Sequence, residues 1–224
     1  MKRIILFKMA ITRLIIGFLV LGIMFFLPAG TLRYWNAWVY IGVLIIPMCI
    51  ALILLIWKDP DLLERRLRMK EKETQQKTII RLSWVIFLLA FTIPGFDYRF
   101  GWTILPVWVV VCADLVILAG FFLFMWVMRV NSYASRIIEV EKEQKVIDTG
   151  PYSVIRHPLY VSNILIYLAT PVALGSVWGF VAILPLPVLI IFRILNEEKI
   201  LKNDLPGYRE YQEKIRYRLV PGTW

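Results

Sequence analysis

The sequence WVYIGVLIIPMCIALILLIW, residues 38–57, contains no charged side chain and is as long as a membrane-crossing helix. Such a helix needs about 20 apolar residues to span the hydrocarbon core. Three other long apolar runs accompany it, and two shorter ones follow. In order, the six runs are residues 11–27, 38–57, 79–96, 102–130, 159–171 and 177–195. They predict an all-α fold, a polytopic membrane helical bundle, because a spanning backbone must satisfy its own hydrogen bonds.

The last two runs differ from the first four in being short or interrupted by proline. Pro171, Pro185 and Pro187 fall within them, and only the residues Ala-Leu-Gly-Ser lie between them. Proline interrupts helices, so we expect these runs to form a helical hairpin that closes the bundle. The prediction is therefore a bundle of five to six spans that ends in this hairpin.

The distribution of positive charge predicts how the bundle is oriented. The net charge is +10, and 24 of the 26 Lys and Arg residues fall in residues 1–13, 58–81, 129–158 and 193–224, which are alternate connections. Basic residues near span ends favour the cytoplasmic side. We therefore expect a multi-pass protein with both termini in the cytosol. Membrane lipids, including anionic headgroups, are expected partners. Nucleic acid is not an expected partner, because the membrane topology already accounts for the excess of Lys and Arg residues.

Polar residues outside this pattern are few. Residues 58–78 open with an Asp-Pro pair, which predicts a short interfacial helix with a solvated charged face. Asp114 lies well inside the fourth run, where a charge is costly, so it should face the bundle, be protonated or mark a site. Cys49 and Cys112 stand alone in apolar runs, so we predict neither a metal site nor a disulfide.

Three polar segments fall on the predicted cytosolic side. They are residues 131–152, the sequence IRHPLY at residues 155–160, and residues 192–201, where the last helix leaves the membrane. The hairpin topology brings residues 144–160 and 193–198 together at its base. This juxtaposition predicts a cytosolic cofactor pocket.

One wall of that pocket is the start of the hairpin. Pro158 suits the first turn of a helix, where its missing N–H group would have no partner in any case. The N–H groups of that turn and the positive end of the helix dipole favour an anion. Arg156 and His157 add hydrogen-bond donors beside it. This wall therefore suits a carboxylate.

The other wall is acidic and aromatic. Glu197 and Glu198 offer carboxylates to an ammonium group or to hydroxyls, and Tyr152 and Tyr160 can place rings or hydroxyls against a cation. A pocket that favours a carboxylate on one wall and a cation on the other suits a zwitterionic, cationic small molecule. S-Adenosylmethionine has this character.

The ordered motifs of residues 129–224 resemble the isoprenylcysteine carboxyl methyltransferase family, which is related to phospholipid N-methyltransferases. The family pattern is a Gly-x-Tyr turn, Arg-His-Pro-x-Tyr, an apolar hairpin, an Arg, paired Glu, a Gly-x-Tyr-x-x-Tyr segment and a final Pro-Gly. In this chain Gly207 directly precedes Tyr208, so the Gly-x-Tyr part aligns only with a one-residue gap. The residues that carry it here are Gly150, Pro151, Tyr152, Arg156, His157, Pro158, Leu159, Tyr160, Arg193, Glu197, Glu198, Tyr208, Tyr211, Pro221 and Gly222. The resemblance implies a transferase without a Rossmann domain, and the sequence has no Gly-rich strand–helix turn.

The resemblance also implies roles for individual residues. The cofactor is S-adenosylmethionine, with S-adenosylhomocysteine as product, and Arg193 is the catalytic, substrate-side residue. A single integral membrane domain, 1–224, is expected: residues 1–128 supply N-terminal spans on the lipid and substrate side, and residues 129–224 form the methyltransferase-like core. The implied cofactor-binding residues are Gln144, Lys145, Val146, Ile147, Tyr152, His157, Pro158, Leu159, Tyr160, Glu197 and Glu198.

The expected reaction is in-line methyl transfer to a lipophilic small-molecule or prenylated substrate, with the carboxylate of a prenylated cysteine or similar isoprenoid preferred. Three alternatives stay open. The first is a phospholipid or small-amine N-methyltransferase. The second is an NADPH-dependent membrane sterol-type reductase, because such enzymes carry similar Arg-His-Pro segments. The third is a non-enzymatic membrane scaffold.

Overall fold

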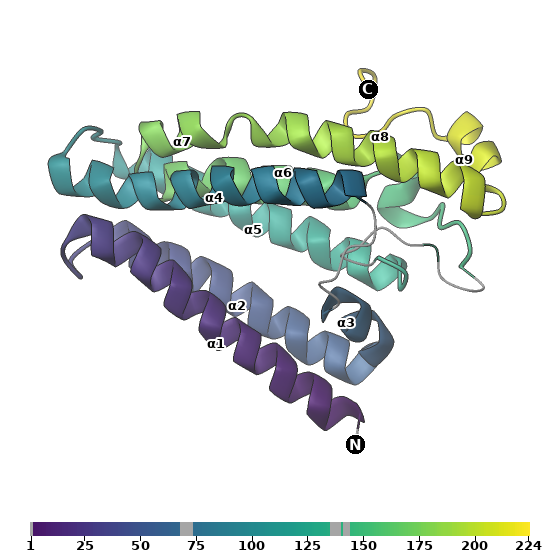
Figure 1. Ribbon diagram of the computed structural model, residues 1–224, viewed down its shortest axis with the longest axis horizontal. Coiled ribbons are helices and arrows are strands. Elements are labelled where there is room, and N and C mark those ends of the chain that lie inside the picture. The colour runs from purple at the N-terminus through teal and green to yellow at the C-terminus, as the bar shows by residue number, and fades with distance from the viewer. Residues whose placement is uncertain (1, 68–73, 135–139, 141–143) are drawn as a thin grey trace.

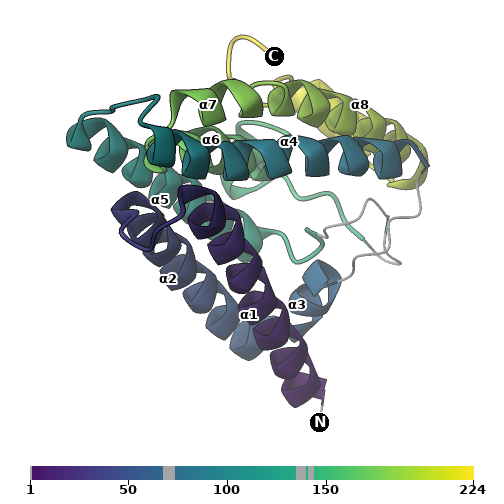
Figure 2. The same cartoon turned by 60° about the vertical axis from the view of Figure 1, so that its left-hand side comes forward.

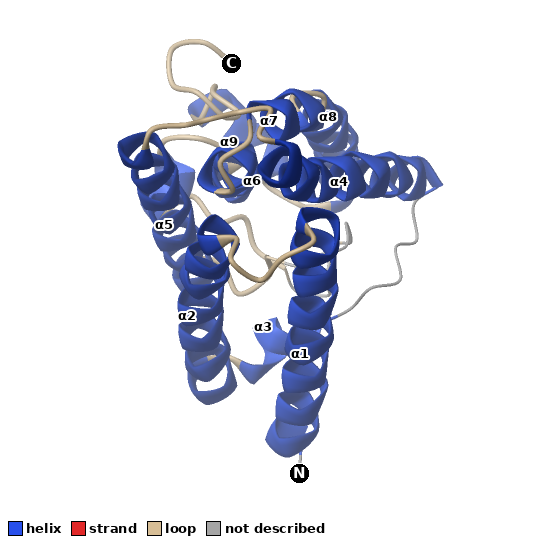
Figure 3. Cartoon of the chain, turned by 90° about the vertical axis from the view of Figure 1, so that its left-hand side faces the viewer, coloured by secondary structure: helices blue, strands red, loops and turns tan. Residues whose placement is uncertain are grey.

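The computed structural model describes residues 2–67, 74–134, 140 and 144–224, and this part of the chain contains helices and no strand (Figures 1 and 3). The all-α prediction is therefore confirmed. The elements are α1 (Lys2–Ala29), α2 (Trp35–Lys58), α3 (Pro60–Leu67), α4 (Thr74–Phe100), α5 (Val107–Val130), the 3-10 turn η1 (Gly150–Ser153), α6 (Pro158–Ala173), α7 (Val177–Ile183), α8 (Leu186–Asp204) and α9 (Tyr208–Lys214).

Five segments are long and apolar enough to cross a membrane, which confirms a multi-pass bundle of the predicted size. They are Arg3–Ala29, Trp35–Lys58, Gln76–Phe100, Val107–Val130 and Val177–Asp204, and the shorter apolar helix Pro158–Ala173 accompanies them. The connections α1–α2, α4–α5 and α6–α7 lie at one end of the molecule, and α3, α9 and the start of α1 lie toward the other (Figure 1). The basic connections therefore share one end, called the basic end below. Its cytosolic location stays a prediction.

Glycine and proline explain several of the helix boundaries. The run at residues 102–130 becomes helical only at Val107, because Gly101 adopts a positive φ of 64° after α4 and Pro106 caps α5. In the last run, the chain breaks between α7 and α8 at Pro185, as predicted. Pro171 lies inside α6, which ends two residues later at Ala173.

Close helix packing depends on glycine, as two contacts illustrate. A Cβ atom on Gly120 of α5 would lie 2.7 Å from Ile166 Cγ1 of α6. One on Gly95 of α4 would lie 2.6 Å from the carbonyl oxygen of Phe25 on α1. Small residues allow helix backbones to approach in this way. Away from the Gly95 contact, α1 and α2 diverge from α4 and α8 toward the basic end (Figures 1 and 2).

The predicted interfacial helix is α3. Asp59 Oδ1 accepts the N–H of Leu62 at 2.9 Å, so the Asp-Pro pair starts the helix as expected. Leu62 and Leu63 are buried, and Arg66 lies 5.1 Å from the centre of the Phe124 ring of α5. The charged face of α3 is thus partly engaged with α5 rather than fully solvated. Residues 68–73 of the predicted segment lie outside the described residues.

Two buried acids lie away from the basic end. Asp114 is 7% exposed and faces the bundle interior, which was one of the three alternatives predicted for it. Asp97, which the sequence did not single out, is 1% exposed and accepts hydrogen bonds from Thr103 N at 2.7 Å and from the hydroxyl of Ser176. Ser176 in turn accepts Gly179 N at 2.9 Å and caps α7. Asp97 therefore joins the α4–α5 connection to the hairpin turn.

Candidate active site

A cavity lies at the basic end, where α5, α6, α8 and α9 meet residues 144–147. About 880 Å³ of space lies in the cavity and before its mouth, and part of this space is open solvent. All predicted site residues except Pro158 and Glu198 line it. The lining therefore includes Gln144, Lys145, Val146, Ile147, Tyr152, His157, Leu159, Tyr160, Arg193 and Glu197. Two segments about forty residues apart in sequence line one cavity, as the hairpin topology predicted.

The faces of α8 explain why neighbouring residues have different surroundings. Residues four apart lie on one face of a helix. Arg193, Glu197 and Leu201 follow this spacing and line the cavity. Ile194 comes directly after Arg193 and is 0% exposed. Glu198 comes directly after Glu197 and is 2% exposed. The adjacent glutamates therefore point to different places: Glu197 to the cavity and Glu198 to the protein interior.

Polar contacts order the cavity wall around Tyr160. Its hydroxyl donates to Glu197 Oε2 at 2.5 Å and accepts from Arg193 Nε at 3.0 Å. Arg193 Nη1 donates to Gln76 Oε1 at 3.0 Å, and Gln76 is fully buried at the start of α4. This contact links the N-terminal half to the cavity. Sequence reasoning missed Gln76, which is one of two adjacent glutamines in a polar stretch that contains no motif.

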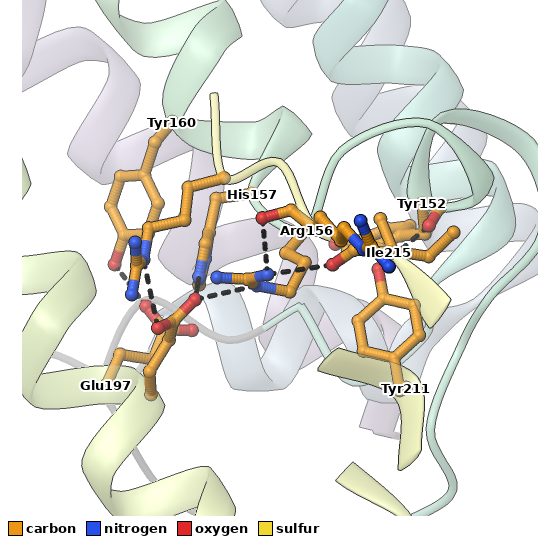
Figure 4. A network of polar contacts seen from close by, with 10 residues as sticks. Tyr152, Arg156, His157, Tyr160, Glu197, Tyr211 and Ile215 are labelled. Atoms are coloured by element: carbon orange, nitrogen blue, oxygen red, sulfur yellow. Dashed lines mark hydrogen bonds and ion pairs between the residues drawn. The ribbon is translucent and has the colours of Figure 1, made fainter. Parts of the chain in front are cut away.

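Glu198 is the centre of a buried ion-pair cluster, drawn in part in Figure 4. Its Oε1 accepts Arg156 Nε at 2.8 Å and lies 3.2 Å from His157 Nε2. Its Oε2 accepts Arg218 Nε at 3.0 Å. The side chains of Glu198 and Arg156 are 3% and 5% exposed. Charges this deeply buried need close partners, and these residues supply them.

Arg156 binds the C-terminal segment as well as Glu198. Its Nη1 donates to the carbonyl oxygens of Ile215 at 2.7 Å and Arg216 at 2.8 Å (Figure 4). These contacts give Arg156 a structural role. Because Arg156 also lines the cavity, its role as a donor to a bound anion stays a prediction. Arg156 and Glu198 hold α6, α8 and the C-terminal segment together behind the cavity.

The start of α6 also differs from the predicted anion site. Pro158 does occupy its first position. However, Arg156 N donates to Tyr217 O at 2.9 Å and His157 N to Arg218 O at 3.0 Å. The N–H groups of residues 160 and 161 both bond to the carbonyl oxygen of His157. Most backbone donors at this helix end are thus engaged within the protein.

Tyrosines form the rest of the wall. Tyr152 accepts a hydrogen bond from Asn131 Nδ2 at 2.9 Å, and burial raises the pKa of its hydroxyl to about 12, so it keeps its proton at neutral pH. Tyr211 donates to the carbonyl oxygen of Tyr152 at 2.8 Å. The buried hydroxyl of Tyr208 lacks a hydrogen-bond partner within the described residues. A cavity-lining hydroxyl in this state is available to a ligand.

Tyr208 and Tyr211 belong to the recognised motif pattern but were not predicted to bind cofactor. Their spacing of three residues places both on one face of α9. Gly207 has a positive φ of 81°, which turns the chain into that helix. The other lining residues that the sequence did not indicate are Asn131, Tyr133, Ala134, Leu201 and Leu205.

Comparison with known proteins agrees with the motifs. Residues 108–205 match a family model described as phospholipid methyltransferase. That family belongs to the isoprenylcysteine carboxyl methyltransferase-like group of membrane methyltransferases, so the predicted resemblance is confirmed. The matched region begins in α5 and ends just after α8, and it contains both glutamates and the Arg-His-Pro-Leu-Tyr segment. No curated protein matches the chain.

Proposed function

We propose, from the match of residues 108–205 to a family of membrane methyltransferases, that this protein methylates the carboxylate of a lipophilic acceptor such as a prenylated cysteine. Methyltransferases of this kind use S-adenosylmethionine. The observation that carries the choice of acceptor is the order of charges on the cavity face of α8. Arg193 lies one turn further into the apolar part of the helix than Glu197.

The positions of Glu197 and Arg193 along α8 suit them to two different ligands, the cofactor and the acceptor. Glu197, with the Tyr160 hydroxyl at 2.5 Å, suits the ammonium group or the ribose hydroxyls of the cofactor. Arg193, nearer the lipid, suits a carboxylate, which a guanidinium can bind through two parallel hydrogen bonds. The acceptor would enter between helices from the bilayer, and the cofactor would enter from the open mouth at the basic end.

The reaction itself requires no proton transfer. A carboxylate oxygen of the acceptor attacks the methyl carbon, a C–O bond forms, and the S–CH₃ bond breaks. The bonding electrons return to sulfur, which leaves neutral S-adenosylhomocysteine and a methyl ester. The protein contributes position and charge placement, which together can supply much of the rate acceleration.

Cofactor binding tests the proposal directly. S-Adenosylmethionine and S-adenosylhomocysteine should each raise the apparent Tm of the detergent-purified protein, because a ligand at 100 times its Kd adds about 2.7 kcal/mol of stability. NADPH at the same concentration should produce no shift. A shift with NADPH alone would indicate the sterol-type reductase, and no shift with any of the three would favour the scaffold.

Substitution of Glu197 tests the site assignment. Glu197→Gln should weaken S-adenosylhomocysteine binding by roughly 10- to 100-fold, the value of a hydrogen bond to a charged group. The apparent Tm without ligand should stay at the wild-type value, because Glu197 lines a cavity rather than the core. Glu210→Gln, the same change at an exposed position on α9, serves as the control. Wild-type affinity in Glu197→Gln would remove this residue from the cofactor site.

Phospholipid N-methylation is the second candidate, favoured by the description of the matched family. An ammonium headgroup must lose a proton before its nitrogen can attack a methyl group. The Tyr160 hydroxyl and Glu197 lie close enough to relay that proton. Glu198 cannot take part in this relay, because it is committed to its ion pairs. The two acceptors also differ in their need for Arg193, since a cation would repel an ammonium substrate.

A further inference from the structure

A second cleft lies on the side of α8 away from the cofactor cavity. Its wall includes four basic side chains, Lys199 and Lys202 from α8, Arg209 from α9, and Arg218 from the C-terminal segment. The first three are exposed. Because α8 turns by about 100° per residue, residues 199 and 202 face away from Arg193 and Glu197. The two hollows therefore use opposite faces of one helix.

The exposed face of α8 locates this cleft relative to the membrane. Val188, Phe192 and Leu195 are 52%, 52% and 43% exposed and follow one another at helical spacing. Lys199 and Lys202 continue the same stripe. A stripe that changes from apolar to basic marks the level at which lipid tails give way to headgroups. The cleft thus opens at headgroup level, with an apolar track leading into the bilayer.

The charge of the cleft is positive even though two glutamates contribute to it. Glu198 is already bound by Arg156 and Arg218, at 2.8 Å and 3.0 Å. Glu213 is the other acid. Three exposed cations therefore face one uncommitted carboxylate, which favours an anionic ligand.

We infer that this cleft binds the headgroup phosphate of an anionic phospholipid. Lys199, Lys202 and Arg209 would hold the phosphate, and the acyl chains would lie along Val188, Phe192 and Leu195. A lipid is favoured over a soluble anion because the apolar track is continuous with the basic group. This site needs neither the cofactor nor the methyl acceptor, and it shares with the cofactor cavity only the Glu198 cluster as a wall.

Lipid retention tests the inference. Detergent-purified protein is incubated with phosphatidylglycerol or with phosphatidylcholine of the same acyl chains, and native mass spectrometry measures the lipid retained at each concentration. Phosphatidylglycerol should be retained at concentrations at least about 10-fold lower. The triple variant Lys199→Gln/Lys202→Gln/Arg209→Gln should require roughly 100-fold more phosphatidylglycerol, since each cation near an anionic headgroup contributes about a factor of five.

A matched control removes the same charge elsewhere at the basic end. Lys8→Gln/Lys77→Gln/Arg81→Gln changes three exposed residues of α1 and α4 and should retain phosphatidylglycerol as the wild type does. Equal loss in both triple variants would show attraction by general surface charge and overturn the site. Equal retention of the two lipids by the wild type would overturn it as well.

A competition experiment distinguishes a bound lipid from a bound soluble anion. Inorganic phosphate in 100-fold excess should leave phosphatidylglycerol bound, because it cannot use the apolar track. Displacement by phosphate would assign the cleft to a soluble anion and overturn the lipid proposal. An unchanged apparent Tm in the Lys199→Gln/Lys202→Gln/Arg209→Gln variant would show that it is folded. No methyl donor is present, so the outcome is independent of the outcome of the cofactor-binding experiment.

Discussion

Glu198→Ala is expected to destabilise the protein by about 3–5 kcal/mol, the range found when one partner of a buried ion pair is removed. The side chain of Arg156 is 5% exposed and would lose the carboxylate that its Nε binds at 2.8 Å. Arg218 would lose the same partner. Because Arg156 also holds the carbonyl oxygens of residues 215 and 216, the C-terminal segment should detach along with the cluster.

The apparent Tm in detergent and limited proteolysis of residues 215–224 measure this effect. Glu197→Ala is the matched control, since it removes the same side chain one residue earlier on α8. It should melt close to the wild type and lose affinity for S-adenosylhomocysteine instead. A Glu198→Ala protein with the wild-type Tm and an intact C-terminal segment would contradict the structural role of the cluster.

This pair of residues shows where prediction from sequence stops. The Glu-Glu pair was recognised as part of the site, and both members were assigned to the cofactor. Their different surroundings follow from a rotation of about 100° between neighbouring helix positions. Which side of α8 faces the cavity depends on how α8 packs against α4 and α6, and no local pattern in the sequence records that packing. Arg156 is a similar case, because its partners at Ile215 and Arg216 are about sixty residues away.

The bundle was more predictable than the site. Apolar runs such as residues 38–57 report span length directly, and alternate basic connections report which helix ends lie together. Local chemistry also located the break at Pro185 and the start of α3 at Pro60. Asp97 was not predicted, since a lone aspartate near a span end resembles an ordinary surface residue until Ser176 is placed beside it.

Arg193→Lys is expected to lower kcat/KM for a prenylated carboxylate acceptor by roughly 100- to 1,000-fold, a loss typical of removing one preorganised contact to the reacting group. Lysine keeps the charge but lacks the planar fork that binds both carboxylate oxygens. It also cannot contact Tyr160 and Gln76 at the same time in the way that the guanidinium does, at 3.0 Å from each. Affinity for S-adenosylhomocysteine should stay at the wild-type level, because Glu197 and the tyrosines are unchanged.

Transfer of a radiolabelled methyl group to a farnesylated cysteine analogue and to phosphatidylethanolamine, with the products identified, measures both candidate reactions in one preparation. Arg81→Lys, the same substitution at an exposed position on α4, is the control and should match the wild type. If Arg193→Lys retains wild-type kcat/KM for the carboxylate, Arg193 does not bind the acceptor. If phosphatidylethanolamine is methylated and the farnesylated cysteine analogue is not, the positive charge of Arg193 does not select the acceptor. The order of charges along α8 would then have to be explained by the cofactor alone, with Arg193 beside its carboxylate and Glu197 beside its ammonium group.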